Sequence, residues 1–467
     1  MSSWLFWPGR RRRAIGELLA QSTRREPVPK RRTSGVPREL VVLVVTAALC
    51  ATALIGARFR HSRLLTRALP AVFGAPKAAH LPPPPPTAAG KGPLVQSSNL
   101  VYEGAFRVPG DTINGTSFAY GGTALGFNPA RQSLFIVGHD WHQKVAEIAI
   151  PDIRHSSALL RLATATVLQP FTDVTEGKMG QVGPNTVKVG GLLAYRGQLY
   201  LSAYVYYDGA GTQVVSHFVS APDLTASGDA RGPYQVGTLG AGFVSGYFGA
   251  VPPAWQDALG GPVINGNCCL GVISRTSYGP ALFAIDPAKL GTTDPLPATP
   301  LVYYPSKHPL ADWDSTSPLF NGTTEMRGVV FHQGTRSVLF FGRHGLGTFC
   351  YGPGTSDAAK AGQPAEGGVD RWCYDPSTES KGTHAYPYTY YVWAYDANDL
   401  AAVKDGQKAP WDVKPYATWP LVLPFSEEGH AVLNGAAYDP ETGRLFLSQG
   451  FGDGELPVIH VFTIQTR

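Results

Sequence analysis

The sequence predicts an all-β domain behind one N-terminal transmembrane helix, and three observations support this prediction. The chain of 467 residues contains 54 glycines and 40 prolines, while charged residues make up only 16% of it, a composition typical of short strands joined by turns. A pattern of three short strands appears at Tyr120 and recurs four more times. One run without charge, Leu40–Ala57, is long enough to span a bilayer as a helix.

The stretch Tyr120–Pro151 shows the repeated pattern most clearly. Gly122–Phe127 is small and apolar, and turn residues at Asn128–Arg131 separate it from the β-rich segment Leu134–Val137. After a polar break, Lys144–Ile150 alternates with the period of a strand. We interpret the stretch as three consecutive strands.

Four further copies follow the same order of strand, turn, strand, loop and strand. These copies begin at Gly191, Gly249, Gly328 and Gly435. A further strand is expected before each copy, at Leu100–Val108, Leu162–Phe171, Tyr234–Leu239, Leu301–Tyr304 and Val413–Leu423.

Five strand triplets and five fourth strands predict a five-bladed β-propeller. In such a ring, Leu100–Val108 would pair with the last strand of the chain, near Thr463. The N- and C-terminal strands would then close the ring and remove two exposed sheet edges. A β-sandwich with coincidental hairpins is the alternative.

The segments before the repeats predict a membrane anchor. We assign residues 1–38 to a basic cytoplasmic segment, 39–57 to a transmembrane helix, 58–98 to a basic and proline-rich stalk, and 99–467 to the propeller. More basic residues precede the apolar run than follow it, which favours a cytoplasmic N-terminus and a propeller outside the cytoplasm, for example in a periplasm. A cleaved signal peptide is the alternative.

The net charge of +5 comes from the N-terminal segment. Beyond residue 70 the acidic residues outnumber the basic ones, so the globular part is acidic. Nucleic acid is therefore an unfavourable partner. The sequence does not indicate an oligomeric state or a cofactor.

The cysteines suit an oxidising compartment, because four of them, an even number, lie outside the membrane run. Cys350 and Cys373 lie in one long insertion of the fourth copy and are predicted to form a disulfide. Cys268 and Cys269 are adjacent, and a strained bridge between them is one option. Free thiols and cross-pairing with the other two cysteines remain open for this pair.

The candidate site should lie on one face of the ring. The long connections are those between second and third strands and those that enter each first strand, and in a propeller both types share one face. Long loops on a rigid scaffold are where function concentrates.

Aligning the copies gives the candidate residues. The ends of the second strands place His139, Tyr204, Asn267, His344 and Gly450 at equivalent positions around one axis, with donors expected to face an open pocket. The predicted ligand-binding residues are His139, Trp141, Tyr204, Asn267, Arg327, Arg343, His344, His430 and Asn434.

Three kinds of chemistry fit these residues. His139, His142, His344 and His430 are candidate metal ligands, although a loop HxxH lacks the fixed spacing of a strong metal motif. Glu176 and Glu325 are a candidate catalytic acid/base pair, but Glu325 could equally form a structural ion pair with Arg327, two residues away. Aromatic faces beside asparagine, arginine and histidine suit a sugar or another polar ligand, and ordinary rim packing is the alternative.

The motif YGGTALGFNP…LFIVGHDW…AEIAIP resembles that of bacterial propeller proteins of unassigned activity, and the repeats resemble those of propeller lectins and propeller glycosidases. The glycosidases carry an acidic residue on the first strand of the first blade, and Ser117–Gly122 contains none. The resemblance implies recognition of a polar ligand, such as a glycan, at the loop-rich face. A hydrolase or metal-dependent enzyme using that face, and a protein-binding scaffold of the cell envelope, remain alternatives.

Overall fold

The computed structural model describes residues 90–184, 186–268, 276–305, 308–310, 317 and 319–466. All of them belong to one compact unit, Ala78–Arg467. The expected transmembrane helix at 39–57 and most of the stalk at 58–98 lie outside the described residues. Within the described part of the chain, no helix has the length and apolar character needed to cross a bilayer.

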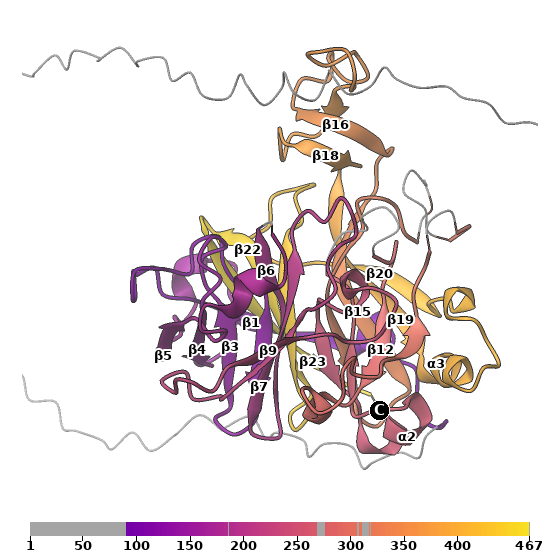
Figure 1. Cartoon of the computed structure of the whole chain (residues 1–467). Helices are drawn as coiled ribbons and strands as arrows, with labels where there is room; N and C mark the ends of the chain where they lie inside the picture. The colour runs from indigo at the N-terminus through magenta and orange to yellow at the C-terminus, as the bar shows by residue number, and fades with distance from the viewer. Residues whose placement is uncertain are drawn as a thin grey trace, which may run out of the picture. The chain divides into compact units, whose positions relative to one another are not determined.

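Five four-stranded antiparallel sheets form the framework of the described chain (Figure 1). Each sheet is named below by its first strand. In bonding order, the β2 sheet contains β2 (Leu125–Asn128), β3 (Ser133–Val137), β4 (Val145–Ala149) and β5 (Val167–Thr172), and the β6 sheet contains β6 (Val187–Tyr195), β7 (Gln198–Val205), β8 (His217–Ser220) and β9 (Arg231–Tyr234). The β10 sheet contains β10 (Phe248–Ala250), β11 (Val263–Asn265), β12 (Leu282–Ile285) and β13 (Thr299–Val302), and the β14 sheet contains β14 (Glu325–Phe331), β15 (Ser337–Gly345), β19 (Tyr388–Asp396) and β20 (Ala417–Leu421). The β21 sheet contains β21 (Leu433–Asp439), β22 (Arg444–Asp453), β23 (Leu456–Ile464) and β1 (Leu100–Arg107).

The helices of the described residues are short and lie in the connections. The α-helices are α2 (Gln256–Leu259) and α3 (Ala397–Lys404). The 3-10 helices are Ser97–Asn99, Leu159–Arg161, Lys178–Gln181, Ala241–Phe243, Pro253–Trp255, Pro287–Lys289 and Pro410–Asp412.

The five first strands form a closed ring. β2 contacts β6, β6 contacts β10, β10 contacts β14, β14 contacts β21, and β21 contacts β2. Along β3, Leu134 and Ile136 pack in a cluster with Phe446 of β22, whereas Phe135 and Val137 pack with residues of the β6 sheet. Successive strand residues point to opposite faces, so this sheet is buried between two neighbours. The arrangement is that of a β-propeller rather than a sandwich.

The first and last strands of the propeller close the ring as the sequence predicts. β1 pairs antiparallel with β23, from Leu100 opposite Ile464 to Arg107 opposite Val458. The backbone N–H of Gln465 also donates to the carbonyl of Asn99 at 2.8 Å. The expected pairing of the first and last strands is confirmed.

A small three-stranded sheet is inserted in the chain between β15 and β19, which are themselves paired neighbours in the β14 sheet. Its strands are β16 (Cys350–Thr355), β17 (Cys373–Tyr374) and β18 (Lys381–His384), and Figure 1 shows this insert standing clear of the larger sheets. The predicted disulfide between Cys350 and Cys373 is confirmed, with a Cα–Cα distance of 5.7 Å. Cys268 is also disulfide-bonded, and its partner lies outside the described residues, as does Cys269.

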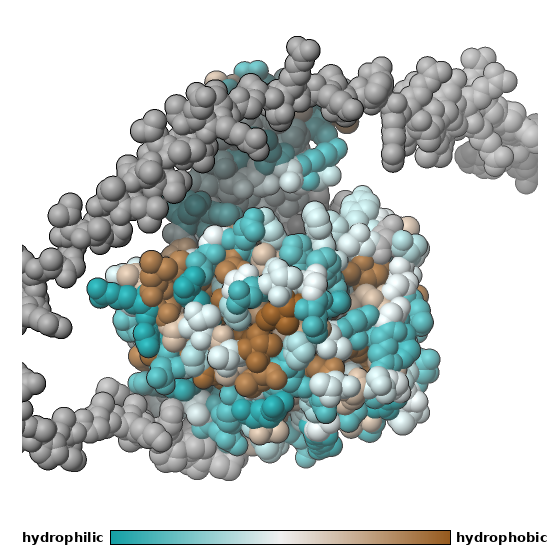
Figure 2. Space-filling model, turned by 90° about the vertical axis from the view of Figure 1, so that its left-hand side faces the viewer, coloured by the Kyte–Doolittle hydropathy of each residue, from teal (hydrophilic) through white to brown (hydrophobic). Residues whose placement is uncertain are grey.

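Four of the five outermost strands contain a proline. Pro170 lies in β5, Pro233 in β9, Pro300 in β13 and Pro420 in β20. Proline lacks the N–H that a ladder needs, so it is tolerated at a sheet edge and not in a central strand. On the side of the molecule where β5 lies, hydrophobic patches are set among polar residues (Figure 2).

Candidate ligand-binding site

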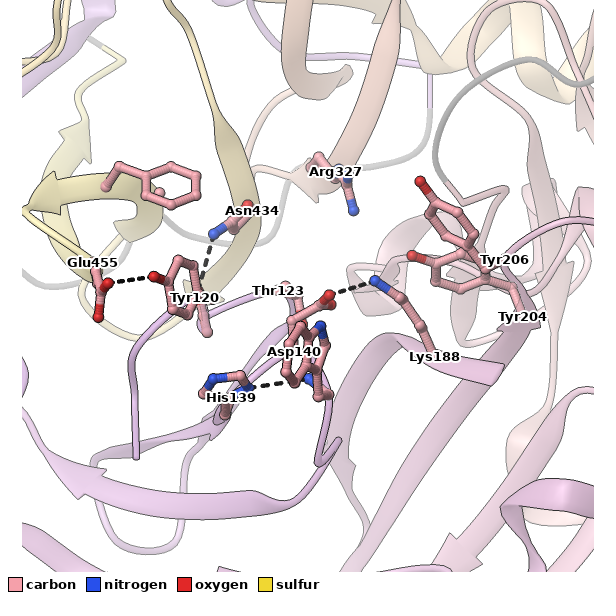
Figure 3. A pocket seen from close by; sticks show the side chains of 14 residues that line it. Tyr120, Thr123, His139, Asp140, Lys188, Tyr204, Tyr206, Arg327, Asn434 and Glu455 are labelled. Carbon is pink, nitrogen blue, oxygen red and sulfur yellow. Dashed lines mark hydrogen bonds and ion pairs between the residues drawn. The ribbon is translucent and has the colours of Figure 1, made fainter. Parts of the chain in front are cut away.

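A pocket of about 580 Å³ opens where the first strands begin, at the centre of the ring (Figure 3). It receives residues from four of the five sheets and their connections. Its lining comprises Tyr120, Gly121, Thr123, His139, Asp140, Trp141, Lys188, Tyr204, Tyr206, Arg327, Asn434, Gly450, Phe451 and Glu455.

A repeated backbone irregularity places several of these side chains. In β14 the register shifts between Met326 and Gly328, and in β21 between Leu433 and Gly435, so Arg327 and Asn434 are the extra residues. A bulge leaves its extra residue out of the ladder and re-aims the side chain. Both bulged residues line the pocket.

The first two sheets carry the same irregularity. Thr123, another lining residue, lies between Gly122, whose N–H donates to the carbonyl of Val137, and Ala124, whose carbonyl accepts from the N–H of Val137. In β6 the extra residue is Gly190, where an added Cβ would collide with the carbonyl oxygen of Ser245. Glycine is therefore required at this position.

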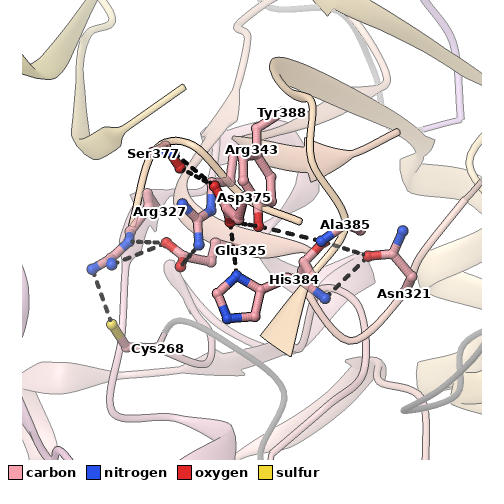
Figure 4. A network of polar contacts seen from close by, with 11 residues as sticks. Cys268, Asn321, Glu325, Arg327, Arg343, Asp375, Ser377, His384, Ala385 and Tyr388 are labelled. Atoms are coloured by element: carbon pink, nitrogen blue, oxygen red, sulfur yellow. Dashed lines mark hydrogen bonds and ion pairs between the residues drawn. The ribbon is translucent and has the colours of Figure 1, made fainter. Parts of the chain in front are cut away.

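The partly buried carboxylate of Glu325 fixes Arg327 in the pocket wall (Figure 4). Glu325 Oε2 accepts from Arg327 Nη2 at 3.1 Å, and its Oε1 lies 2.7 Å from Arg343 Nη2. Burial alone would raise the pKa of Glu325, but the charges of the two arginines leave it below its ordinary value. Burial likewise opposes the charge on Arg327, yet Glu325 and Tyr204 leave the pKa of Arg327 raised.

This network continues into the insert. The Arg343 guanidinium lies 4.7 Å from the ring centre of Tyr388, and the Tyr388 hydroxyl donates to Asp375 Oδ2 at 2.7 Å. Asp375 also lies 2.8 Å from His384 Nδ1 of β18. Burial would raise the pKa of Asp375, but its hydrogen bonds, led by that with His384, lower it to about 2. The wall of the pocket and the base of the insert are thus joined by one network of polar contacts, in which Tyr388 lies between Arg343 and Asp375.

On another side of the pocket, Lys188 and Asp140 form an ion pair. The Lys188 ammonium also lies 4.7 Å from the ring centre of Tyr206. Gln143 Oε1 accepts from the N–H of Val189 at 2.7 Å, which ties the connection between β3 and β4 to β6. These contacts hold the connection while leaving the Trp141 side chain 85% exposed.

Opposite Lys188, Tyr120 donates a hydrogen bond to Glu455 (Figure 3). Tyr120 and Phe451 both have left-handed backbones, with φ of 56° and 63°, and their ring centres are 6.0 Å apart. Such a conformation is unfavourable for a bulky residue and is retained where its surroundings impose it, often at a functional site. Both rings remain partly exposed at the pocket.

Five of the nine predicted ligand-binding residues line this pocket: His139, Trp141, Tyr204, Arg327 and Asn434. Gly450, the fifth aligned strand-end residue, lines it too. Arg343 does not line the pocket and lies behind its wall, bound to Glu325. His430 does not line the pocket either, but its ring stacks on that of the lining residue Phe451, with ring centres 6.4 Å apart.

The structure places Asn267 and His344 in the protein interior instead. Asn267 Oδ1 accepts from the hydroxyl of Tyr247 at 2.9 Å and from the N–H of Ala281 at 2.8 Å. His344 Nδ1 lies 2.9 Å from Thr324 Oγ1, and burial lowers the pKa of His344 to about 4. The expectation that these side chains face an open pocket is corrected, because both are buried.

The candidate catalytic and metal groups do not converge on the pocket. Glu176 accepts hydrogen bonds from the backbone N–H groups of Gly228 and Asp229, and no described contact joins it to Glu325. His139 and His142 have ring centres 5.0 Å apart. Among the described residues, no group of three or more histidine, cysteine or acidic side chains is arranged to hold a metal ion.

Sequence reasoning gave no site role to several lining residues. The predicted ligand-binding residues do not include Tyr120, Asp140, Lys188, Tyr206, Phe451 and Glu455, which all line the pocket. Phe451 lies near the end of β22 and Glu455 in the turn before β23, both within a stretch expected as one of the long connections on the functional face. The position of that connection was the available signal for these two residues.

Comparisons with known proteins yield structural neighbours only. No model of a known protein family matches the chain, and no curated protein matches it. A putative glycoside hydrolase from Parabacteroides distasonis is 10% identical with a TM-score of 0.37, over 80% of this chain and 96% of that chain. Native arabinanase from Bacillus subtilis is 9% identical with a TM-score of 0.38, over 77% of this chain and 96% of that chain.

A glycosyl hydrolase from Bacteroides ovatus is 10% identical with a TM-score of 0.36, over 80% of this chain and 94% of that chain. These three neighbours are named as glycoside hydrolases or as an arabinanase. At such identities and TM-scores, they assign no activity to this protein.

Proposed function

We propose that this protein is a membrane-anchored, five-bladed β-propeller that recognises a neutral glycan at the pocket in the centre of its ring. The observation that carries the proposal is the combination of exposed aromatic rings and internally paired charges around one pocket. Trp141 is 85% exposed, Tyr206 63%, Phe451 46% and Tyr120 42%.

Aromatic rings and planar polar groups are complementary to a sugar. The apolar face of a sugar ring packs on an aromatic face, while Asn434, Asp140 and Lys188 offer donors and acceptors for hydroxyl groups. Lys188 is paired with Asp140, while Arg327 and Arg343 share the carboxylate of Glu325, which leaves one positive charge in excess. Glu455 offsets that charge, so the charged groups at the pocket balance and favour a neutral ligand.

A glycan array followed by titration calorimetry with the best neutral ligand tests the proposal. Trp141→Ala should weaken binding about tenfold or more, since aromatic anchors carry much of the binding energy at such sites. Trp411→Ala is the matched control, because Trp411 is exposed but does not line the pocket. Absence of neutral-glycan binding, or equal binding by wild type and Trp141→Ala, would reject the proposal.

The membrane anchoring and the orientation of the protein are a separate part of the proposal. The five sheets would be the blades, residues 39–57 the anchor and 58–98 the stalk, with the N-terminus cytoplasmic. The Cys350–Cys373 disulfide supports an oxidising compartment for the propeller. A reporter fused to Arg467 should be active only outside the cytoplasm and should sediment with membranes, and activity only inside the cell would refute this placement.

A hydrolase is the second candidate, and one observation favours it. Asp140 and Glu455 both line the pocket, and a pair of carboxylates is the usual requirement for cleaving a glycosidic bond. Turnover of chromogenic glycosides that is lost in both Asp140→Asn and Glu455→Gln would establish this activity. Binding without turnover leaves the recognition function alone.

A further inference from the structure

The insert rises from the same end of the ring as the loops around the pocket. It connects the second and third strands of the β14 sheet, β15 and β19. Trp141 and Tyr206 lie in the corresponding connections after β3 and β7, and Phe451 lies near the end of the second strand β22. Equivalent connections of antiparallel sheets in a closed ring share one end, so the insert and the pocket are neighbours.

The base of the insert is also bonded to the pocket wall. Arg327, a lining residue, pairs with Glu325, which pairs with Arg343 (Figure 4). Arg343 lies against Tyr388, where the chain returns from the insert. The insert is therefore held at a fixed position beside the pocket rather than joined through a free linker.

Exposed tyrosines lead from the pocket toward the insert. Tyr206 lines the pocket, and the next residue, Tyr207, is 68% exposed. On the insert, Tyr351 of β16 is 45% exposed, and the Lys381 ammonium lies 5.6 Å from its ring centre.

Their positions in the fold bring Tyr207 and Tyr351 toward the same part of the surface. Tyr207 follows Tyr206, which lines the same pocket as Arg327, and Arg327 is joined through Glu325 to Arg343 at the base of the insert. Tyr351 follows Cys350 at that base, where β16 begins. The pKa of Lys381, raised first by its hydrogen bond with Asp370 and to a smaller extent by Tyr351 and Tyr207, agrees with this placement.

We propose that Tyr207 and Tyr351 form a second binding surface continuous with the pocket, and that the ligand is a neutral oligosaccharide chain rather than a single sugar. This inference rests on the proposed function of the pocket. One end of the oligosaccharide fills the pocket, and the following sugar units pass over Tyr206 and Tyr207 to the insert. Exposed aromatic rings in such a row provide one stacking face for each successive unit.

The test measures affinity against chain length. Neutral gluco-, manno-, galacto- and xylo-oligosaccharides, from monosaccharide to hexasaccharide, are titrated into the full-length protein. For the series that binds, affinity should increase beyond the disaccharide. Tyr207→Ala and Tyr351→Ala should each weaken hexasaccharide binding about three- to tenfold while leaving the shortest ligand unaffected.

Tyr374→Ala is the matched control, since Tyr374 is exposed on the same insert but is not among the groups that act on Lys381. The Tyr374→Ala variant should bind oligosaccharides of every length with the affinity of the wild type. If oligosaccharides bind with equal affinity at all lengths, or if Tyr207→Ala and Tyr351→Ala behave as the control, the second surface is refuted and the pocket function stands. If no neutral saccharide of any length binds, the proposed function itself fails, and the second surface with it.

Discussion

Glu325 pairs with two arginines at the wall of the pocket, so a single residue both positions Arg327 and offsets one of the two positive charges. Its side chain is 15% exposed, and both of its carboxylate oxygens are engaged. The alignment of repeats predicted that Arg327 and Asn434 occupy matching positions, and the bulges of β14 and β21 show why they do. The alignment could not predict the pairing of Glu325 with Arg343, which lies directly opposite it on the neighbouring strand β15.

Strand length explains why some aligned residues do not reach the pocket. β3 ends at Val137, so His139 already belongs to a connection, whereas β15 continues to Gly345 and includes His344. Equivalent sequence positions therefore fall in a loop in one sheet and inside a strand in another. Hydrogen bonding across the sheet decides where a strand ends, and the repeat pattern does not contain that information.

Replacing Glu325 with glutamine should destabilise the protein by about 3–5 kcal/mol, because two partly buried guanidinium groups would lose their shared counter-ion. The measurement is the free energy of unfolding in urea. Glu103→Gln is the control, since Glu103 pairs with Arg444 at a more exposed position and should cost about 1 kcal/mol or less. Similar losses in the two variants would contradict the structural role of Glu325.

Four buried histidines should make the protein sensitive to acid. Burial lowers the pKa of His217 and His460 to about 3, and of His332 and His344 to about 4. In the unfolded chain a histidine takes up its proton near pH ~6.5, so between that pH and the lowered pKa only the unfolded state is protonated. Stability should therefore fall as the pH drops from about 6.5 toward 4, by about 1.4 kcal/mol per pH unit for each histidine.

Unfolding free energies measured at several pH values across this window test the effect. His460→Gln should reduce the slope by about one histidine's share. The exposed His155, changed to glutamine, should leave the slope unaltered. An unchanged slope in His460→Gln would show that this histidine does not contribute to the acid sensitivity.

At the scale of elements, the outer strands were the hardest to place from the sequence. The fourth strand of the β6 sheet was expected at Tyr234–Leu239 and is found at Arg231–Tyr234, where it contains Pro233. An outer strand bonds on one side only, so it accepts a proline that would exclude a central strand. The inner strands were easier, because burial on both faces requires continuous apolar runs such as Leu134–Val137.

The insert is an element that the sequence indicated only by its length and its cysteines. Its three strands are short, and the Cys350–Cys373 bridge links β16 to β17. Reducing this bridge should loosen the insert while the larger sheets stay folded, with a local loss of up to about 3 kcal/mol. Limited proteolysis with and without reductant, read by mass spectrometry, should show new cuts confined to residues 346–387.

Cys350→Ser/Cys373→Ser should reproduce the proteolysis pattern of the reduced protein without any reductant. This variant separates the insert bridge from the disulfide of Cys268. Cleavage spread evenly over the large sheets would mean that the insert bridge supports the whole ring rather than its own small sheet.

For the whole molecule, closure by β1 is the main long-range constraint. β1 supplies the outer strand of the β21 sheet, and residues just before it are bonded elsewhere, with Val95 N–H donating to Ser337 Oγ at 2.8 Å. Deleting residues 1–110 should therefore abolish cooperative unfolding, because β23 would lose its partner along its full length. Deleting residues 1–90 should leave the melting temperature unchanged.

Calorimetry of the two truncated proteins gives the comparison. The shorter deletion serves as the control, since it removes nothing that pairs with β23. Equal melting temperatures for both would show that the ring does not depend on its N-terminal strand.

The prolines of the outer strands affect how copies of the protein behave toward one another at high concentration. An open sheet edge invites a strand of another molecule to add to it, which is one route to fibres and precipitates. β5, β9, β13 and β20 each interrupt that edge with a residue that has no N–H to offer. The fifth outer strand, β1, instead carries a register shift beside Glu103. We therefore expect neighbouring copies to remain separate along their sheet edges, even when the protein is crowded.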